Sequence, residues 1–214
     1  MQTRKISHVD KLLIQAEAAL RTVFGNPPLS GRPNPADTYA EVEMSEAEKK
    51  HTAGLMRVNH SGEVSAQGLY QGQALTARLP DVREKMEQAA VEENDHLVWC
   101  EQRLNDLAAH KSVLNPVWYT GSFLIGATAG AVGDKWSLGF VAETEHQVVR
   151  HLDEHLQSLP QHDQRSRAVL EQMKTDEAKH ATTALHHGGA ELPLPVKTMM
   201  GLMSKVMTRT AYWI

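Results

Sequence analysis

Cysteine is nearly absent from this sequence. Among its 214 residues there is one cysteine, Cys100, so no disulfide bond can form within the chain. That usage is typical of a reducing compartment. A rubredoxin-type iron site, which needs a cysteine pair, is excluded for the same reason.

The sequence also lacks an excess of positive charge, since 22 lysines and arginines stand against 26 acidic residues. The formal net charge is −4, whereas proteins that bind nucleic acids usually present a basic surface. We therefore expect no nucleic-acid partner. The first ten residues are polar and charged, so we also expect no secretory signal there.

Strand-like alternation of apolar and polar residues is missing over any useful length, so we predict an all-α chain. Apolar residues recur at helical spacing between Ser7, which can cap a helix, and Gly25, which can end it. Residues 25–38 carry four prolines and indicate a linker. We divide the chain into an N-terminal helix with its linker (1–44) and a helical domain (45–214).

Helix boundaries in the domain follow from capping and stop signals. Ser45-x-x-Glu is a capping-box pattern that begins one helix, and Pro80 ends it. Asp81 is expected to cap the next helix. Two later helices extend to Pro160 and to the glycine pair at 188–189. Four long helices are therefore expected.

Two copies of Glu-x-x-His lie on these helices. Glu93 and His96 form one copy, and Glu177 and His180 form the other. This spacing places both side chains on one face of a helix, about one turn apart, where they can bind one metal ion. A single copy is common as a solvated pair, so only the presence of two copies indicates a metal site.

Each copy follows a lone glutamate: Glu63 precedes the first by 30 residues and Glu145 precedes the second by 32. All these residues lie in apolar seams, where a charge is costly unless it is paired or bound to metal. Mixed carboxylate and imidazole ligands suit iron or manganese, and the residues alone do not choose between them. The predicted metal ligands are Glu63, Glu93, His96, Glu145, Glu177 and His180.

Four neighbouring residues are candidates for supporting roles. Glu92 and Asp176 precede the motif glutamates, and each could accept a hydrogen bond from an imidazole N–H; simple exposed acids are the alternative. His151 lies about 120° around the helix from Glu145, so spacing alone makes it a flanking histidine. Tyr70 lies seven residues after Glu63, close to the same helix face; it could support the site, but we interpret it as a core tyrosine.

Further stretches surround the motifs: Arg57-Val58-Asn59-His60-Ser61-Gly62-Glu63, Tyr70-x-Gly72-Gln73, Asn115-Pro116-x-Trp118, the stretch from Glu145 to His151, and Asp176-Glu177-x-x-His180. Together with Glu93-x-x-His96 they closely resemble the demethoxyubiquinone hydroxylase family of ubiquinone biosynthesis. The resemblance runs from about residue 50 to the C-terminus. It implies a ferritin-like four-helix bundle, whose di-iron ligands are one Glu from each of two helices and one Glu-x-x-His from each of the others.

The resemblance also implies an activity, an oxygen-dependent di-iron monooxygenase that hydroxylates the ring of a polyprenylated demethoxy-quinol. It assigns the metal role to the same six residues and two iron ions to the chain, and it suggests that His151 lies near the iron. The expected partners are the polyprenyl quinone and O₂, with NADH considered as external reductant. Other ubiquinone-biosynthesis proteins or a second copy of the chain are further candidate partners.

Two apolar segments bear on membrane contact. Residues 112–133 carry no charge, but Asn115 and Pro116 interrupt them, and a single span would separate the halves of the ligand set. We predict a buried core helix with one membrane-facing end. Residues 195–214 predict an amphipathic helix that lies on a bilayer or covers the bundle. With the family resemblance, this favours a peripheral membrane protein on the cytoplasmic face of the bacterial cell membrane.

Three alternatives use the same residues. A ferritin- or rubrerythrin-like iron-oxidation or peroxidase protein would have the same ligands, and so would a manganese catalase. In a non-enzymatic helical assembly protein, the Glu/His pairs would have a structural role. That last alternative leaves four acids in apolar seams unexplained.

Overall fold

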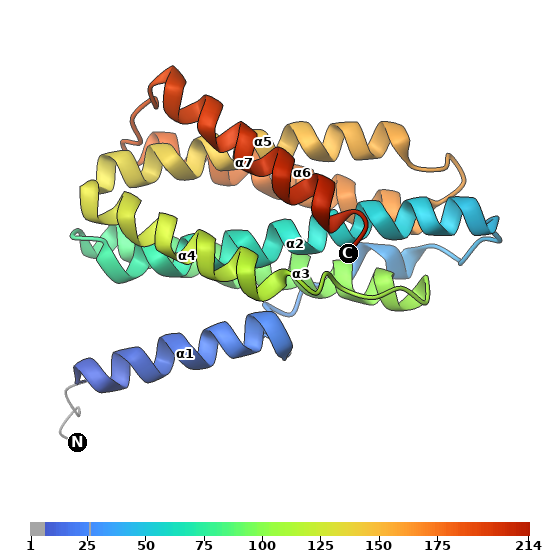
Figure 1. The fold of residues 1–214 in the computed structure, drawn as a ribbon, viewed down its shortest axis with the longest axis horizontal. Coiled ribbons are helices and arrows are strands. Elements are labelled where there is room, and N and C mark those ends of the chain that lie inside the picture. Colours follow the sequence, from blue (N-terminus) through green and yellow to red (C-terminus); the bar gives the residue numbers. More distant parts are fainter. Residues whose placement is uncertain (1–6, 26) are drawn as a thin grey trace.

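The computed structural model describes residues 7–25 and 27–214, which form seven α-helices and one short 3₁₀ helix (Figure 1). Most of the polar N-terminus on which we based the absence of a secretory signal lies outside this part of the chain. No strand occurs among the described residues, so the all-α prediction is confirmed.

Four long helices form a bundle: α2 (Glu46–Thr76), α3 (Pro80–Asp106), α5 (Asp134–Ser158) and α6 (Gln164–His186). Each contributes to two apolar cores. To the first core they contribute Met56, Cys100, Leu152 and Met173, in chain order. To the second they contribute Tyr70, Met86, Val141 and Ala184.

The order in which each helix meets the two cores gives its direction. Helices α2 and α6 run from the first core to the second, whereas α3 and α5 run from the second to the first. Because α3 and α5 point the same way, a crossover must join them, and α4 (Asn115–Val132) supplies it (Figure 1). A bundle with one crossover is the ferritin-like topology, as predicted.

The helix ends follow the predicted signals with one exception. Ser45 caps α2, because its hydroxyl accepts a hydrogen bond from the backbone N–H of Glu48. The prediction that Asp81 caps α3 is wrong: Leu79 is the N-cap and Pro80 is the first helical residue. Proline suits that position because its missing N–H would have no helical partner. Asp81 therefore lies in the first turn.

Helix α4 packs closely on α2. A Cβ added to Gly72 would lie 2.2 Å from the carbonyl oxygen of Phe123, and one added to Gly126 would lie 2.2 Å from that of Leu69. The prediction of a buried core helix is wrong for the far side of α4, where Leu124 is 60% exposed. A crossover lies outside the bundle, so part of its surface stays uncovered by the other described helices. None of the described helices is both long and apolar enough to cross a bilayer.

The remaining elements pack on the outside of the bundle. Helix α1 (His8–Phe24) contacts α2 and α4, and α7 (Leu194–Ala211) lies across α2 and α5 (Figure 1). Between α1 and α2, the described residues of the proline-rich segment contain only the 3₁₀ helix η1 (Pro35–Thr38). This segment is docked on the bundle, since Ala36 is buried in the first core.

Candidate metal centre

The six predicted ligands lie midway along the bundle, between its two cores. On α2, for example, Glu63 lies between Met56 of the first core and Tyr70 of the second. The other ligands lie between the same two cores on α3, α5 and α6. The four glutamates and His96 are all buried, and the His180 side chain is 11% exposed. Apolar packing at both ends therefore separates the site from water.

The two histidines face the glutamates through Nδ1. In His96 this atom lies 2.9 Å from Oε2 of Glu93 and 3.2 Å from Oε1 of Glu177. In His180 it lies 3.1 Å from Oε1 of Glu93 and 3.3 Å from Oε2 of Glu177. Ligand atoms of Glu63, Glu93, His96 and Glu177 all lie within 4.8 Å of one another. This buried group could hold a metal ion.

Glu145 brings the fourth carboxylate from α5. Its Oε1 accepts a hydrogen bond from the hydroxyl of Tyr70, and its carboxyl neighbours that of Glu177. Burial, together with the charges of Glu177 and Glu93, raises the pKa of Glu145 well above its ordinary value. Tyr70 is a buried core tyrosine, as interpreted from the sequence, but it also contacts the site.

The electrostatics of the group fit a pair of divalent cations. Burial raises the pKa of Glu63 well above its ordinary value, and the charges of Glu93 and Glu177 raise it further. Four ionised carboxylates in a dry site repel one another unless positive charge balances them. Two divalent cations would supply that balance.

The imidazoles supply part of that positive charge themselves. Burial opposes a charge on His180, but hydrogen bonds to Glu177 and Glu93 outweigh it and raise its pKa to about 12. Burial likewise opposes a charge on His96, yet Glu93 and other acids raise its pKa well above the ordinary value. Both rings therefore bind carboxylates through the nitrogen that would bind a metal.

The two outer acids pair crosswise with the histidines. Oδ2 of Asp176, on α6, accepts a hydrogen bond of 3.1 Å from Nε2 of His96 on α3. Oε2 of Glu92, on α3, accepts one of 2.7 Å from Nε2 of His180 on α6. Such hydrogen bonds hold the ring orientation of metal-binding histidines. Each acid thus contacts the histidine of the other motif.

His151 is not brought to this cluster. Its Nε2 lies 2.9 Å from Oγ of Ser204 on α7, and its Nδ1 lies 3.7 Å from Oε2 of Glu154. Conversely, the structure brings Arg32 to the outer acids, since its Nη1 donates to Asp176. Nothing in the proline-rich sequence around Arg32 indicates that contact, because it depends on how the segment folds back on the bundle.

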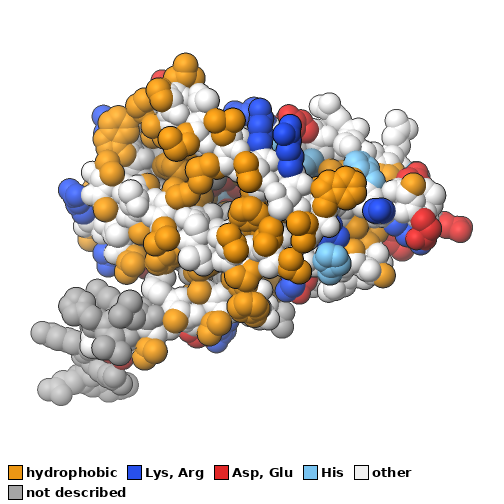
Figure 2. Space-filling view, in the orientation of Figure 1, with side chains coloured by type: hydrophobic (Ala, Val, Ile, Leu, Met, Phe, Trp, Pro, Cys, Tyr) orange, Lys and Arg blue, Asp and Glu red, His pale blue; other side chains and the backbone are white. Residues whose placement is uncertain are grey.

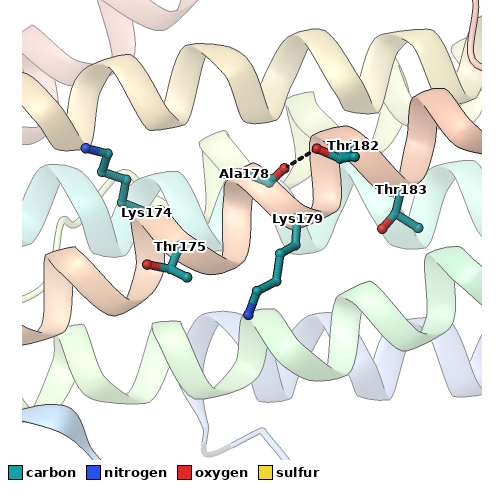
Figure 3. Close-up of a pocket in the computed structure, with 6 residues that line it drawn as sticks. All are labelled: Lys174, Thr175, Ala178, Lys179, Thr182 and Thr183. Atoms are coloured by element: carbon teal, nitrogen blue, oxygen red, sulfur yellow. Dashed lines mark hydrogen bonds between the residues drawn. The ribbon is translucent and has the colours of Figure 1, made fainter.

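Two hollows lie near these helices. A narrow crevice between α2 and α5 is lined by Leu69, Tyr70, Gln73, Phe140, Val141 and Glu145, among others, so it reaches the site. An open hollow lies on α6. Figure 3 shows that two of its lining residues, Lys174 and Lys179, point to opposite sides. None of the predicted ligands lines that second hollow. Of these two hollows, the crevice is the one that reaches the metal centre, but it has no room for even a water molecule.

Comparisons with known proteins agree with this geometry. The family model described as "Ubiquinone biosynthesis protein COQ7" matches residues 43–211. A protein of Nitrosococcus oceani named 3-demethoxyubiquinol 3-hydroxylase is 61% identical over 214 residues, covering 100% of both chains. Proteins of the same name from Stutzerimonas stutzeri and Ectopseudomonas mendocina are 60% and 59% identical, each covering 99% of this chain and 98% of the relative.

Proposed function

Because the chain belongs to the family of ubiquinone biosynthesis protein COQ7, we propose that it is a di-iron monooxygenase that hydroxylates a demethoxyubiquinol ring with O₂. The observation that carries the proposal is the convergence of four buried glutamates and two histidines from four helices between two apolar cores. Mixed carboxylate and imidazole ligands of this kind suit iron. The relatives' shared name supplies the substrate class.

The residues have distinct tasks in this reaction. Glu63, Glu93, Glu145, Glu177, His96 and His180 would hold two iron ions. Bound iron supplies the activation of O₂. Tyr70 keeps its proton in the hydrogen bond to Glu145 and so holds that carboxylate in place. Glu92 and Asp176 hold the two imidazole rings through Nε2.

The crevice between α2 and α5 is the proposed entry for the quinol ring; because it has no room for even a water molecule in this structure, the two helices must separate to admit the ring. Leu69, Phe140 and Val141 give it an apolar lining, and Glu145 connects it to the ligands. An apolar lining excludes water and accepts an aromatic ring together with the start of a prenyl tail. The tail itself would extend outward past α4 and α7, the helices that pack on α2 and α5 beside the crevice.

We also propose that this side of the molecule rests on a membrane, at the cytoplasmic face of the bacterial cell membrane. Hydrophobic side chains cover much of the face formed by α4 and α7 (Figure 2). The exposed apolar residues of these two helices are Val117, Leu124, Val132, Leu194, Val196, Met199, Leu202, Met203 and Val206. Exposed apolar surface of this extent marks an interaction site. A polyprenyl quinone dissolves in the bilayer, so the substrate would enter from there.

Vesicle flotation tests the membrane proposal. The protein is expected to float with vesicles of phosphatidylethanolamine and phosphatidylglycerol, and the double variant Leu124→Glu/Leu202→Glu is expected to stay in the dense fraction. Thr175→Glu/Thr182→Glu adds the same two charges at exposed positions on α6 and should float like the wild type. Equal flotation of all three proteins, or none by the wild type, would contradict the proposal.

The hydroxylase proposal is tested by metal analysis and by product. Purified protein is expected to contain close to two irons and to convert a short-tailed demethoxyubiquinol to the hydroxylated quinol with O₂, using NADH as external reductant. Glu93→Gln should lose both metal and product. Iron oxidation or peroxide turnover without ring hydroxylation would instead favour the ferritin- or rubrerythrin-like alternative. A protein without bound transition metal would contradict the site.

A further inference from the structure

Arg32 belongs to the proline-rich segment before α2, outside the range that the family model matches. Its guanidinium nevertheless joins the two helices that carry the Glu-x-x-His motifs. Nε donates to Oδ2 of Asp95 on α3 at 2.7 Å, and Nη1 donates to Oδ2 of Asp176 on α6 at 2.6 Å. Arginine donates in a rigid planar fork, so these contacts fix the relative position of both acids.

The surroundings hold Arg32 in that position. Its Cζ lies 5.0 Å from the ring centroid of Trp99, which is 2% exposed. The backbone N–H of Ser30 donates to Oδ1 of Asp95 at 2.9 Å, and Nδ2 of Asn34 donates to Oε1 of Gln102 at 2.7 Å. The segment is therefore fastened to α3 on both sides of Arg32.

The same Asp176 oxygen that accepts from Arg32 also accepts from Nε2 of His96. We propose that Arg32 is a positioning residue of the metal centre: it holds the Asp176 carboxylate against His96, whose other nitrogen faces the glutamates. This inference rests on the proposed metal site. It gives the segment before α2 a task in the reaction.

Without Arg32, Asp176 has other partners close by. Its Oδ1 already lies 3.0 Å from Nε2 of Gln172 and 3.6 Å from Nζ of Lys179. A carboxylate released by Arg32 can turn toward them and away from the imidazole. Residues that orient a metal-binding histidine typically change metal affinity by about 10- to 100-fold when they are removed. Arg32 contacts Asp176 and not the histidine itself, so we expect a change in metal affinity at the lower end of this range.

The opposite motif has a different arrangement. Glu92, which accepts from His180, has a half-exposed carboxylate, and in the described part of the chain no arginine or lysine contacts it. Arg32 reaches only the backbone carbonyl of Glu92, at 3.4 Å. The Asp176–His96 side is therefore the one that Arg32 supports. Loss of Arg32 should weaken the metal-binding step that uses His96 more than the step that uses His180.

Cobalt(II) binding to the full-length, metal-free protein tests the inference, by calorimetric titration and by the visible absorption of bound cobalt. Arg32→Met is expected to weaken one binding step by about tenfold and to change the cobalt spectrum. Arg32→Lys, which keeps the charge but not the fork, should fall between Arg32→Met and the wild type. Asn34→Ala is the matched control, because it loosens the same segment without touching Asp176.

A double-mutant cycle identifies the route of the effect. In an Asp176→Asn background, adding Arg32→Met should cost little further affinity if Arg32 acts through Asp176. Wild-type cobalt affinity in Arg32→Met, an equal loss in Asn34→Ala, or additive losses in the cycle would each overturn the inference while leaving the metal site standing. A wild-type protein that binds no cobalt would overturn the metal site itself.

Discussion

The carboxylate of Asp176 on α6 meets the imidazole of His96 on α3, with Oδ2 and Nε2 3.1 Å apart. The acid therefore supports the histidine of the other Glu-x-x-His motif, and Glu92 does the same for His180. Because each imidazole is held from the opposite helix, the two halves of the site depend on each other. A displacement of α3 relative to α6 would disturb both histidines together.

Replacing Glu92 and Asp176 should reveal unequal roles. Asp176→Asn is expected to lower cobalt affinity by about 10- to 100-fold. Glu92→Gln is expected to lower it by less, because the Glu92 side chain is 50% exposed and water can replace the lost hydrogen bond. Titration of both variants measures the difference. A larger loss in Glu92→Gln would contradict this ranking.

Tyr70→Phe should destabilise the metal-free protein. The buried Glu145 carboxyl loses its hydrogen-bond donor, and an unsatisfied buried acceptor costs about 1–3 kcal/mol. Urea unfolding in the presence of a chelator measures this as a lower free energy of unfolding. Tyr39→Phe, at an exposed tyrosine, should change the free energy little. Equal stability of the two variants would show that the Tyr70 hydroxyl does not support Glu145.

Glu63→Gln should have opposite effects on the metal-free and metal-loaded protein. Burial and neighbouring acids disfavour the charge of Glu63, so its removal should stabilise the metal-free form. Metal binding should raise the free energy of unfolding of the wild type, by about 2.7 kcal/mol when free metal is 100 times its Kd. The variant should lose most of that gain. Thermal unfolding with and without cobalt measures both effects: a higher stability of the metal-free variant and a smaller stabilisation of the variant by metal.

Acid should destabilise the fold through two buried histidines. Burial, helped by Lys111, lowers the pKa of His60 from 6.5 to about 3. Burial, helped by the charges of His151 and His51, lowers that of His155 from 6.5 to about 4. Below pH 6.5 the unfolded chain therefore binds more protons than the folded one, so stability falls as pH falls. The loss continues until the pH passes below the folded pKa values.

Each of these histidines can contribute up to about 1.4 kcal/mol per pH unit in this window. His60→Gln should therefore show a shallower loss of the free energy of unfolding between pH 7 and pH 5 than the wild type. Urea unfolding at both pH values measures this loss for each protein. Subtracting the loss in the variant from that in the wild type removes the contributions of other titrating groups. Parallel pH dependences would show that His60 is readily protonated in the folded state.

Two glycines of α4 should respond in opposite directions to the same change. Gly126→Ala would place its Cβ 2.2 Å from the carbonyl oxygen of Leu69, so α2 and α4 must separate, at a cost of about 1–3 kcal/mol. Gly121→Ala meets no atom within 4 Å and should stabilise the helix by about 0.5–1 kcal/mol. Chemical unfolding of both variants measures the two signs. A stabilised Gly126→Ala would contradict the close packing.

Much of the fold was predictable because its signals are local. Capping patterns such as Ser45-x-x-Glu depend on a few consecutive residues, and apolar periodicity depends on the geometry of one helix. The exception at Asp81 has a local cause too, since proline at the first helical position displaced the expected cap. The exposed side of α4 was not predictable, because exposure depends on whether another helix covers it.

The sequence by itself determined that Glu93 and His96 share one helix face, as Glu177 and His180 do, because a three-residue spacing on a helix leaves no other arrangement. Only the tertiary structure decided how helices distant in the chain pair their side chains. In the folded chain, Asp176 contacts His96 and Tyr70 contacts Glu145. His151 lies against Ser204, and Arg32 contacts the two helices that carry the motifs. Those contacts join residues 53 to 144 positions apart, and at such separations the packing of the whole bundle sets which side chains meet.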